Sequence, residues 1–525
     1  MRAGQVNPTQ SRVLAVILIA AFGIRLAIAW APFEWLIRTV LGDDPFYYFT
    51  IARNFVSEHG FSFDTVEPTN GFHPLWMFLI LPIFKFVHDP IVAIHSVLTL
   101  AALLDTLSLL LIFKLLEKCH VRIEITVVIA AVYSVLPLLL STSGALNGLE
   151  TSLNITLLLA FLILYHQIFE QPAVPRSLAL RFGLYSGLLF LARTDNGILL
   201  ACSFVFLVWN RRRSMSTLNP VFVSAATAGI VLLPWLLWSY ENFGSLVQVS
   251  GLSVGYFMRE LVARGGWTIA DYGKQFVRNS GVILGYIPGY LKEAHVLSWP
   301  NLPNIAFWGV LSLGLFRARH RSDLWEKAKP WLGPGISVFI FLLVHTLRGV
   351  QLRGWYYASM LPIAILFVAI TLEQIAQFDP RRRVISWVAG IICGYSVLVS
   401  IVRLLPPGCG ETDAYRMIQV VNDTLPEGSR VGSWNAGLFG YFFTRGQVVN
   451  LDGLVNNRAY EHILDHSLGE YCYERDISFL LDAEGAVNIW KPYWNHAGEV
   501  NFPDPLIDNA KTCLCRRILL LPLKP

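Results

Sequence analysis

Long apolar runs recur from Val13 to Leu405, and they constrain the fold more than any other feature of the chain. About 20 consecutive apolar residues suffice for a helix that crosses the hydrocarbon core of a bilayer. The runs of this kind are Val13–Trp30, Ile91–Phe113, Ile125–Leu140, Leu153–Phe169, Pro220–Tyr240, Leu302–Phe316, Pro330–Val344, Trp355–Leu372 and Val384–Leu405. A longer stretch, Leu178–Trp209, is interrupted by the polar segment ARTDN, and we interpret it as two short helices.

The composition agrees with a membrane protein. Of the 525 residues, 54% are hydrophobic and only 15% are charged, whereas about a quarter of the residues in soluble proteins are charged. The net charge is +5, and nothing in this balance favours nucleic acid as a partner; the lipid bilayer is the expected one. Because Arg25 lies inside the first apolar run, we interpret that run as a retained signal anchor rather than a cleaved signal peptide.

Basic residues give the orientation of these segments, since Lys and Arg concentrate in cytoplasmic loops. The basic clusters are Arg2 and Arg12, Lys114 to Arg122, Arg176 and Arg181, Arg211–Arg213, Arg317–Arg321, and Arg381–Arg383. The number of crossings between clusters is even throughout if the short run His73–Val87 is a re-entrant or interfacial segment. The sequence therefore predicts about eleven crossings in the plasma (inner) membrane, a cytoplasmic N-terminus and an extracytoplasmic C-terminal region.

The predicted organisation is an α-helical polytopic membrane domain, residues 1–405, followed by a small extracytoplasmic α/β domain, residues 406–525. A first outer loop covers 31–90 and a long outer loop covers 241–301. The segments SRVGSW, QVVNLDG and ISFLLDA are expected strands of the α/β domain. Its four cysteines, Cys409, Cys472, Cys513 and Cys515, allow one or two disulfides, whereas Cys119, Cys202 and Cys393 are isolated thiols that indicate no metal site.

Two adjacent aspartates stand in the first outer loop, in the sequence LGDDPFYYF. Pro45 suits the first position of a helix and Asp44 the N-cap, with the helix ending near Gly60. Asp43 lies one residue earlier, so we expect its carboxylate to be free beside the bilayer. A free carboxylate in this place suits a general base toward a hydroxyl group. Alternatively, Asp43 and Asp44 would hold a divalent cation, Mg²⁺ or Mn²⁺.

Arginines on the same predicted face are candidates for binding a phosphate group. They are Arg53, Arg193, Arg348 and Arg353. The planar guanidinium group makes forked hydrogen bonds to phosphate. The alternative interpretation is that these side chains reach the interface as isolated charges or pair with Asp195 and Glu150.

Further polar and aromatic residues on this face are candidates for lining a substrate site. They are Asn70, His73, Glu150, Asp195, Trp355, Tyr356 and Tyr357. Glu150 is equally placed to form a capping box with Asn147, His73 has a structural hydrogen-bonding role as its alternative, and the three aromatic residues are also typical of an interfacial belt. Asp105, inside a predicted span, is either functional or paired with Arg25.

The motifs resemble those of the GT-C superfamily of membrane glycosyltransferases, which use polyprenyl-phosphate sugars. DDPFYYFTIARN is similar to the acidic motif of their first outer loop, and TNGFHPLW is similar to the exit of that loop in arabinofuranosyl- and mannosyltransferase-like bacterial members. LARTDNG, PWLLWSYENFG and LRGWYYASMLP follow in the expected order. The resemblance implies an inverting single displacement with Asp43 as the base and Asp44 as a structural or metal-binding helper. It also implies that Glu150 and Arg193 line the site.

The predicted function is transfer of a hexosyl or pentosyl unit from a polyprenyl-phosphate donor to a cell-envelope glycan, lipid or protein acceptor. Two other functions compete with it. A non-enzymatic lipid or solute transporter would place its polar groups near the bilayer midplane, whereas here they collect at one face. A polymer ligase that uses a pyrophosphate lipid would not need the paired aspartates.

Overall fold

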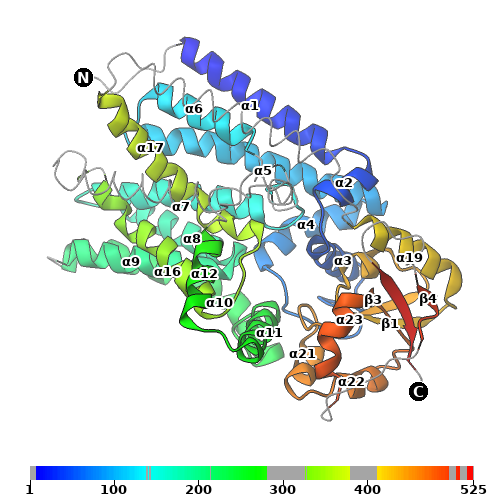
Figure 1. Cartoon of the computed structure of the whole chain (residues 1–525). Coiled ribbons are helices and arrows are strands. Elements are labelled where there is room, and N and C mark those ends of the chain that lie inside the picture. The colour runs from blue at the N-terminus through cyan, green and yellow to red at the C-terminus, as the bar shows by residue number, and fades with distance from the viewer. Residues whose placement is uncertain are drawn as a thin grey trace.

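The computed structural model describes residues 8–136, 140, 144–212, 215–280, 326, 328–378, 411–495, 504–508 and 517–523. The predicted spans Leu302–Phe316 and Val384–Leu405, the basic clusters beside them and Cys393, Cys409, Cys513 and Cys515 lie outside these residues. The described chain forms a body of long helices with an α/β unit at one end (Figure 1).

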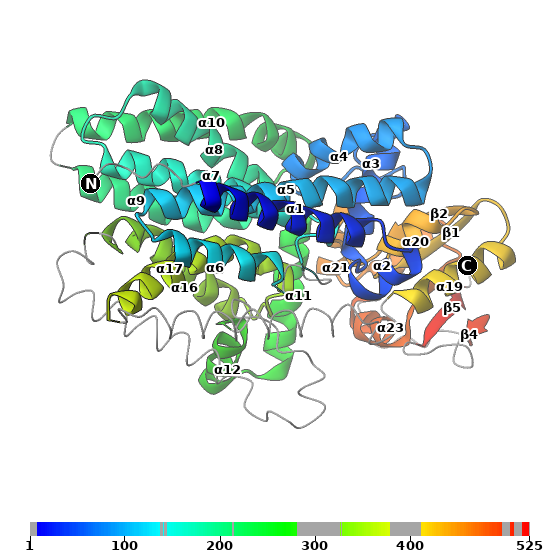
Figure 2. The same ribbon diagram turned by 90° about the horizontal axis from the view of Figure 1, so that it is seen from above.

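The helical body is built from helices that pack side by side over most of their length (Figure 2). They are α1 (Pro8–Ala29), α5 (Pro90–Lys118), α6 (Ile123–Ser134), α7 (Thr151–Glu170), α8 (Arg176–Ala192), α9 (Gly197–Arg211), α10 (Met215–Phe243), α16 (Leu332–Leu347) and α17 (Leu361–Phe378). The most extensive contacts join α8 with α10, α5 with α7, and α9 with α16. Helix α7 lies at the centre, with most of its side chains buried.

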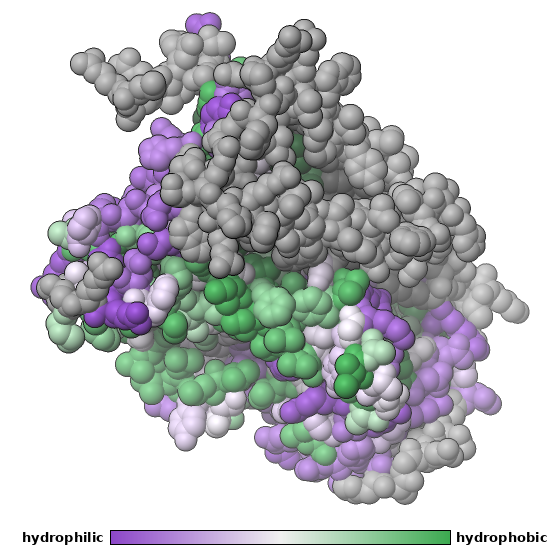
Figure 3. Space-filling model, turned by 60° about the vertical axis from the view of Figure 1, so that its left-hand side comes forward, coloured by the Kyte–Doolittle hydropathy of each residue, from purple (hydrophilic) through white to green (hydrophobic). Residues whose placement is uncertain are grey.

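Five described helices are long and apolar enough to cross a membrane. They are Arg12–Ala29, Pro90–Lys118, Thr151–Glu170, Thr217–Phe243 and Lys329–Leu347. Their outward side chains include exposed large apolar residues, among them Ile19 at 71% and Ile230 at 71% exposure. Figure 3 shows one face on which apolar side chains form a broad surface between hydrophilic regions. Apolar surface of this extent is expected where lipid replaces water as the neighbour.

Several details of the predicted segmentation can be compared with these helices. The stretch Leu178–Trp209 is divided into α8 and α9 by a short 3-10 turn, Thr194–Asn196, as predicted. The short run His73–Val87, at the end of the first outer loop, contains helix α4 (Pro74–Phe86), with Pro82 inside it. The predicted start of a span at Trp355 is wrong, because Gly354–Ser359 is a 3-10 helix and α17 begins only at Leu361.

Arg25 and Asp105 form a buried ion pair in the described helical body, and together with Tyr133 they join three helices. The Arg25 Nε atom of α1 donates to Asp105 Oδ2 of α5 at 2.5 Å, and the Tyr133 hydroxyl of α6 donates to Asp105 Oδ1 at 2.6 Å. Arg25 and Asp105 are 0% and 1% exposed. Of the two interpretations of Asp105, pairing with Arg25 is therefore confirmed.

The two outer loops also fold into helices. Helices α2 (Phe33–Thr39) and α3 (Asp44–Val56) precede α4 in the first loop, and α11 (Val249–Gly265) and α12 (Ile269–Ser280) form the described part of the second. Beyond α3, both Glu58 and Gly60 have positive φ, which turns the chain out of the helix near the predicted position.

The C-terminal region is an α/β unit, as predicted. Its strands are β1 (Ser429–Ser433), β2 (Gly446–Asn450), β3 (Phe479–Ala483), β4 (Ile507–Asp508) and β5 (Ile518–Pro522), in the order β2-β1-β3-β5-β4. The first three are parallel, and β5 runs antiparallel to β3 and β4. Its helices are α19 (Thr412–Thr424), α20 (Gly437–Phe442), α21 (Asn457–Leu464), α22 (Leu468–Glu474) and α23 (Glu484–Trp490). Cys472 is buried in this unit with a free thiol.

The carboxyl ends of β1 and β2 face the first outer loop. The Asn457 side chain donates to Asn70 Oδ1 at 3.1 Å and accepts from the Thr69 hydroxyl at 3.1 Å. Gly71 touches the backbone of Leu454 so closely that a Cβ atom on residue 71 would lie 2.0 Å from the Leu454 carbonyl oxygen. Helix α3 packs against α20 in the same region. The α/β unit is thus fastened to the loop that carries the paired aspartates.

Candidate active site

Asp43 is engaged by the C-terminal unit. Its Oδ1 atom accepts from the backbone N–H of Leu438 at 2.7 Å and its Oδ2 atom from that of Gly437 at 3.1 Å. The expectation that this carboxylate is free is therefore wrong, because its partners come from a segment 394 residues later in the chain. Burial and the nearby Glu411 carboxylate raise the pKa of Asp43 to about 7, against the opposing effect of the two N–H groups.

Asp44 is the less constrained of the two acids. The structure makes Asp43 the N-cap residue of α3 and Asp44 its first helical residue, so the predicted cap is displaced by one position, and neither side chain makes a capping hydrogen bond. Among the described residues, no hydrogen bond or ion pair engages the Asp44 carboxylate. Burial and the neighbouring Asp43 raise its pKa to about 6, while Arg353 acts in the opposite direction. This carboxylate is available to a ligand.

Arg193 is held by two carboxylates at the break between α8 and α9. Its Nε and Nη2 atoms donate to the two oxygens of Asp195 at 3.1 and 2.6 Å, and its Nη1 atom donates to Glu150 Oε1 at 2.6 Å. The guanidinium group also lies 4.9 Å from the centre of the Tyr356 ring. Burial works against ionisation of Arg193, but the two carboxylates prevail and raise its pKa above the usual value. The structure therefore agrees with the alternative interpretation of Arg193, in which its side chain pairs with Asp195 and Glu150.

Glu150 connects this ion pair to the first outer loop. The Tyr48 hydroxyl of α3 donates to Glu150 Oε2 at 3.2 Å and accepts from the backbone N–H of His73 at 3.0 Å. The capping-box interpretation of Glu150 is wrong, since its side chain makes no cap hydrogen bond and Asn147 instead accepts from Leu149 N. Glu150 therefore lies within the polar cluster.

His73 stands at the edge of the same cluster. Its Nε2 atom is 3.7 Å from Glu150 Oε1, and its Nδ1 atom is 3.3 Å from the side-chain nitrogen of Gln248. Burial lowers the pKa of His73, and Glu150 only partly offsets this effect. The neutral imidazole is consequently the favoured form at pH 7.

The other predicted phosphate-binding arginines occupy different surroundings. Arg353 is exposed, close enough to Asp44 to affect its pKa, and makes no ion pair among the described residues. Arg348 is also exposed, and its Nη2 atom donates to the Gly251 carbonyl oxygen at 3.2 Å. Arg353 is therefore the arginine that combines an available charge with proximity to Asp44.

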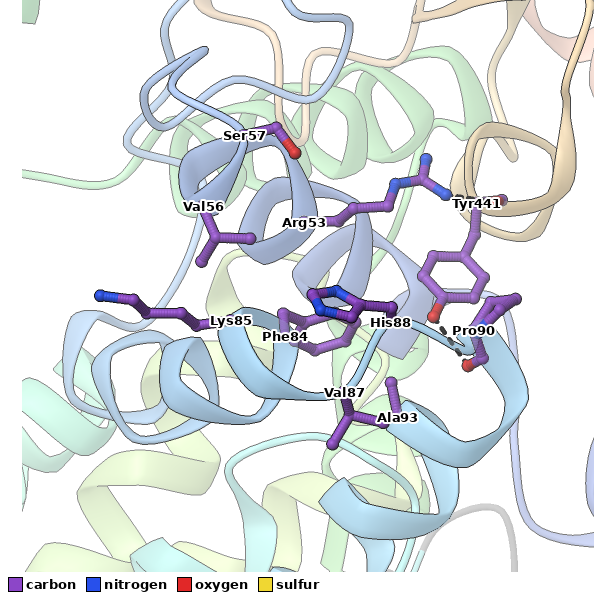
Figure 4. Close-up of a pocket in the computed structure, with 10 residues that line it drawn as sticks. All are labelled: Arg53, Val56, Ser57, Phe84, Lys85, Val87, His88, Pro90, Ala93 and Tyr441. Carbon is purple, nitrogen blue, oxygen red and sulfur yellow. Dashed lines mark hydrogen bonds between the residues drawn. The ribbon is translucent and has the colours of Figure 1, made fainter.

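Arg53 extends toward Tyr441 of the C-terminal unit, as Figure 4 shows. Its guanidinium group donates to the carbonyl oxygens of Tyr441 and Gly440 at 2.8 and 3.1 Å, at the end of α20. It borders a separate cavity of about 300 Å³ that Lys85 and His88 also line. The grouping of Arg53 with the other arginines is thus wrong, because α3 turns its side chain toward the C-terminal unit.

Four other predicted lining residues differ in their surroundings. Asn70 is fully buried, and its side chain bonds Ser239 and the N–H of Val249, so it fastens the loop to α10 and α11. Tyr357 is buried in the helical body, whereas Tyr356 is partly exposed against Arg193. Trp355 packs partly buried against the core. Of these aromatic residues, Tyr356 is the one that the structure brings to the cluster.

Two residues of this region were absent from the predicted set. The Tyr47 hydroxyl donates to the Trp434 carbonyl oxygen and accepts from the N–H of Ala436, which joins α3 to the loop after β1. Asp452, in the loop after β2, is close enough to Asp43 and Asp44 for their charges to raise its pKa, although burial is the larger cause. One sequence pattern could have indicated Asp452, because it follows a predicted strand, and the carboxyl ends of strands often carry functional residues in α/β proteins.

Asp43 and Asp44 were also candidates for holding a divalent cation. Within the described residues, no group of three or more His, Cys, Asp or Glu side chains is arranged to hold a metal ion.

The arrangement of the helices is similar to the fold of solved GT-C glycosyltransferases. The archaeal oligosaccharyltransferase AglB from Archaeoglobus fulgidus, in complex with an inhibitory peptide and a dolichol-phosphate, aligns with 91% of this chain and 69% of its own, at 14% identity and a TM-score of 0.53. ArnT from Cupriavidus metallidurans, bound to undecaprenyl phosphate, aligns over 97% of both chains at 12% identity and a TM-score of 0.53. At these identities the likeness shows the fold.

Sequence comparison adds one match, to the C-terminal region. Residues 406–511 match a family described as a domain of unknown function (DUF8728). No curated protein sequence matches the chain significantly.

Proposed function

We propose that this chain is a membrane glycosyltransferase that moves a sugar from a polyprenyl-phosphate donor to a hydroxyl-bearing acceptor, with Asp44 as the general base. The observation that carries the proposal is the difference between the two adjacent acids. Asp43 is bonded to the C-terminal unit, whereas Asp44 has no partner within the described residues and lies beside Arg353. The base predicted at position 43 is thereby moved to position 44.

The reaction is an inverting single displacement. The acceptor oxygen forms a bond to the anomeric carbon while its proton moves to the Asp44 carboxylate. The bond between the anomeric carbon and the phosphate oxygen breaks, and the polyprenyl phosphate leaves with the electron pair. A carboxylate with a pKa of about 6 is ionised at neutral pH and is still a better base than an ordinary aspartate.

Arg353 is assigned to the donor phosphate. Its guanidinium group is exposed and not committed to a carboxylate among the described residues, so its N–H groups are available for the negative charge that develops on the leaving group. Arg193 supports the site indirectly, because it fixes Glu150 and Asp195 around Tyr356. The polyprenyl phosphates bound to AglB and ArnT support a donor of this class.

The proposed topology follows the sequence prediction. About eleven crossings within residues 1–405 form the membrane domain, and residues 406–525 form the second domain on the extracytoplasmic side of the plasma membrane. The acidic loop and the α/β unit then share that side, where a lipid-linked donor presents its sugar.

The test replaces Asp44 and Asp43 singly with Asn and measures transfer from labelled polyprenyl-phosphate mannose and polyprenyl-phosphate arabinofuranose in membranes. Asp44→Asn should lower kcat by about 10²- to 10⁴-fold, because a general base contributes this much. Asp43→Asn should keep more activity, since an amide oxygen still accepts one of the two N–H bonds. Asp465→Asn, at an exposed position of the C-terminal unit, is the matched control.

Two results contradict the proposal. If Asp44→Asn keeps wild-type kcat with a donor that Asp43→Asn no longer turns over, Asp44 is not the base. If the wild-type protein neither transfers nor hydrolyses any polyprenyl-phosphate sugar, the proposed function itself is wrong.

A further inference from the structure

We infer that the cavity beside Arg53 binds the phosphate group of an anionic membrane phospholipid, a ligand separate from the sugar donor. The cavity lies where α3, α4 and the start of α5 meet α20 of the C-terminal unit (Figure 4). Arg53 follows Asp44 by nine positions on α3, or about 14 Å along the helix axis. The cavity is therefore a site distinct from the acidic pair, and its ligand does not depend on the proposed reaction.

The lining of the cavity has the chemistry of an anion site. Arg53, Lys85 and His88 line it, whereas none of the described lining residues is acidic. Its volume of about 300 Å³ is at the lower end of the usual range for ligand sites. Apolar side chains such as Val56 and Phe84 form much of the remaining wall. A negatively charged group with an attached apolar part fits this combination.

Arg53 brings a partly buried charge that no carboxylate neutralises among the described residues. Its Nη1 and Nη2 atoms donate to the backbone carbonyl oxygens of Tyr441 and Gly440 at 2.8 and 3.1 Å, and these bonds use two of the five N–H groups of a guanidinium. Burial lowers the pKa of Arg53. An anion in the cavity would favour the charged form and accept hydrogen bonds from the remaining N–H groups.

The two other basic residues extend this positive region. Figure 4 shows the His88 imidazole between Arg53 and Lys85, whose side chains extend in different directions. Lys85 and His88 are exposed and make no ion pair in the described part of the chain. The adjacent Asp89 caps α5, since its Oδ1 atom accepts from two backbone N–H groups of that helix at 2.9 and 2.8 Å. Because the basic groups are spread along the cavity, an extended headgroup contacts more of them than a single small ion does.

The position of the cavity favours a membrane lipid over a soluble phosphate compound. Helix α5 is long and apolar enough to cross a membrane, and its first residue, Pro90, lines the cavity. Lys85 and His88 shortly precede this helix, and basic side chains at the ends of spanning helices reach the level of the lipid headgroups. On α4, the helix that carries Lys85, Phe86 and Phe78 are 75% and 50% exposed. Acyl chains can pack on this apolar surface.

A structural role is the alternative for Arg53, because its bonds fasten α3 to α20 and its replacement can disturb folding. Lys85 and His88 avoid this difficulty, since both are exposed. The test variants are therefore Lys85→Gln and the double variant Lys85→Gln with His88→Gln. Lys274→Gln is the matched control, because Lys274 is an exposed lysine of α12 that pairs with Asp271 at 3.1 Å.

The experiment measures lipid binding to the full-length protein in a nonionic detergent, by native mass spectrometry and by thermal melting. The probes are dioctanoyl phosphatidylglycerol, dioctanoyl phosphatidylcholine, glycerol 3-phosphate and undecaprenyl phosphate. The first two differ in headgroup charge, glycerol 3-phosphate lacks acyl chains, and undecaprenyl phosphate represents the lipid of the donor. Because no sugar transfer is measured, this test and the test of the proposed function can fail separately.

We expect phosphatidylglycerol to bind and to raise the melting temperature, and Lys85→Gln to weaken its binding about tenfold, the worth of a hydrogen bond to a charged group. The double variant should weaken it further, whereas Lys274→Gln should bind as the wild type does. Equal binding by the wild type and the double variant overturns the inference. Equal binding of phosphatidylcholine or of glycerol 3-phosphate also overturns it, since headgroup charge or acyl chains would then not matter. Displacement of phosphatidylglycerol by undecaprenyl phosphate would assign the cavity to the donor instead.

Discussion

Two buried polar clusters of this molecule use the same residue types in different ways. Between α1, α5 and α6, Arg25, Asp105 and Tyr133 bond to one another in the interior of the helical body. At the break between α8 and α9, Arg193 is shared by Glu150 and Asp195, but Asp44 and Arg353 stand beside this second cluster without ion-pair partners among the described residues. The inner cluster balances its charges and joins helices. The second cluster keeps charges that a ligand can use.

The largest effect is expected from breaking the inner cluster. Asp105→Asn leaves the Arg25 guanidinium without its carboxylate in a buried site, which should cost about 3–5 kcal/mol of stability. Thermal melting and the yield of folded protein in detergent measure this loss. The double variant Arg25→Leu with Asp105→Leu should recover much of it, since no charge stays buried. Equal stability of Asp105→Asn and the wild type would show that the inner pair is not structural.

A smaller effect, on activity rather than stability, is expected at Arg353. Arg353→Ala removes the proposed phosphate contact and should raise KM for the polyprenyl-phosphate donor about ten- to a hundredfold, the worth of a hydrogen bond to a charged group. Arg348→Ala is the matched control, because Arg348 is exposed on the same segment. The measurement is the KM for the donor in both variants, and only Arg353→Ala should raise it strongly. Comparable increases would remove the distinction between the two arginines.

The smallest effect is a shift in pH dependence. The base must be ionised, so kcat should fall as the pH drops through about 6, the pKa of Asp44. Arg353 lowers that pKa, and its removal in Arg353→Ala should therefore move the acid limb of the profile to higher pH. A kcat profile from pH 4.5 to 8.5 for both proteins measures the shift. A limb that stays in place would mean that Arg353 does not act on the base.

The parts of the fold that depend on local composition could be predicted from the sequence. Apolar runs gave most helices, and the segments around Val431, Val448 and Leu480 are strands as expected. Helix ends were less accurate: α6 stops at Ser134, because local apolarity does not define where the helical backbone ends.

The sequence predicted several residues of the candidate site, but it did not predict what each of them contacts. The polar loops were expected on one face, and Glu150, Arg193, Asp195 and Tyr356 do lie together. The roles of Asp43 and Arg53 could not be predicted, because both bond to backbone atoms of residues 437–441. Contacts between such distant segments leave no pattern in the local sequence.

The bond between Asp43 and the N–H groups of Gly437 and Leu438 has a consequence for biogenesis. The ribosome releases the first outer loop long before it makes the segment that receives this loop. Asp43 and Asp44 consequently reach their final arrangement only after most of the polypeptide has been synthesised and the C-terminal α/β unit has folded. A nascent or prematurely terminated chain can therefore enter the membrane before the acidic pair has its final surroundings.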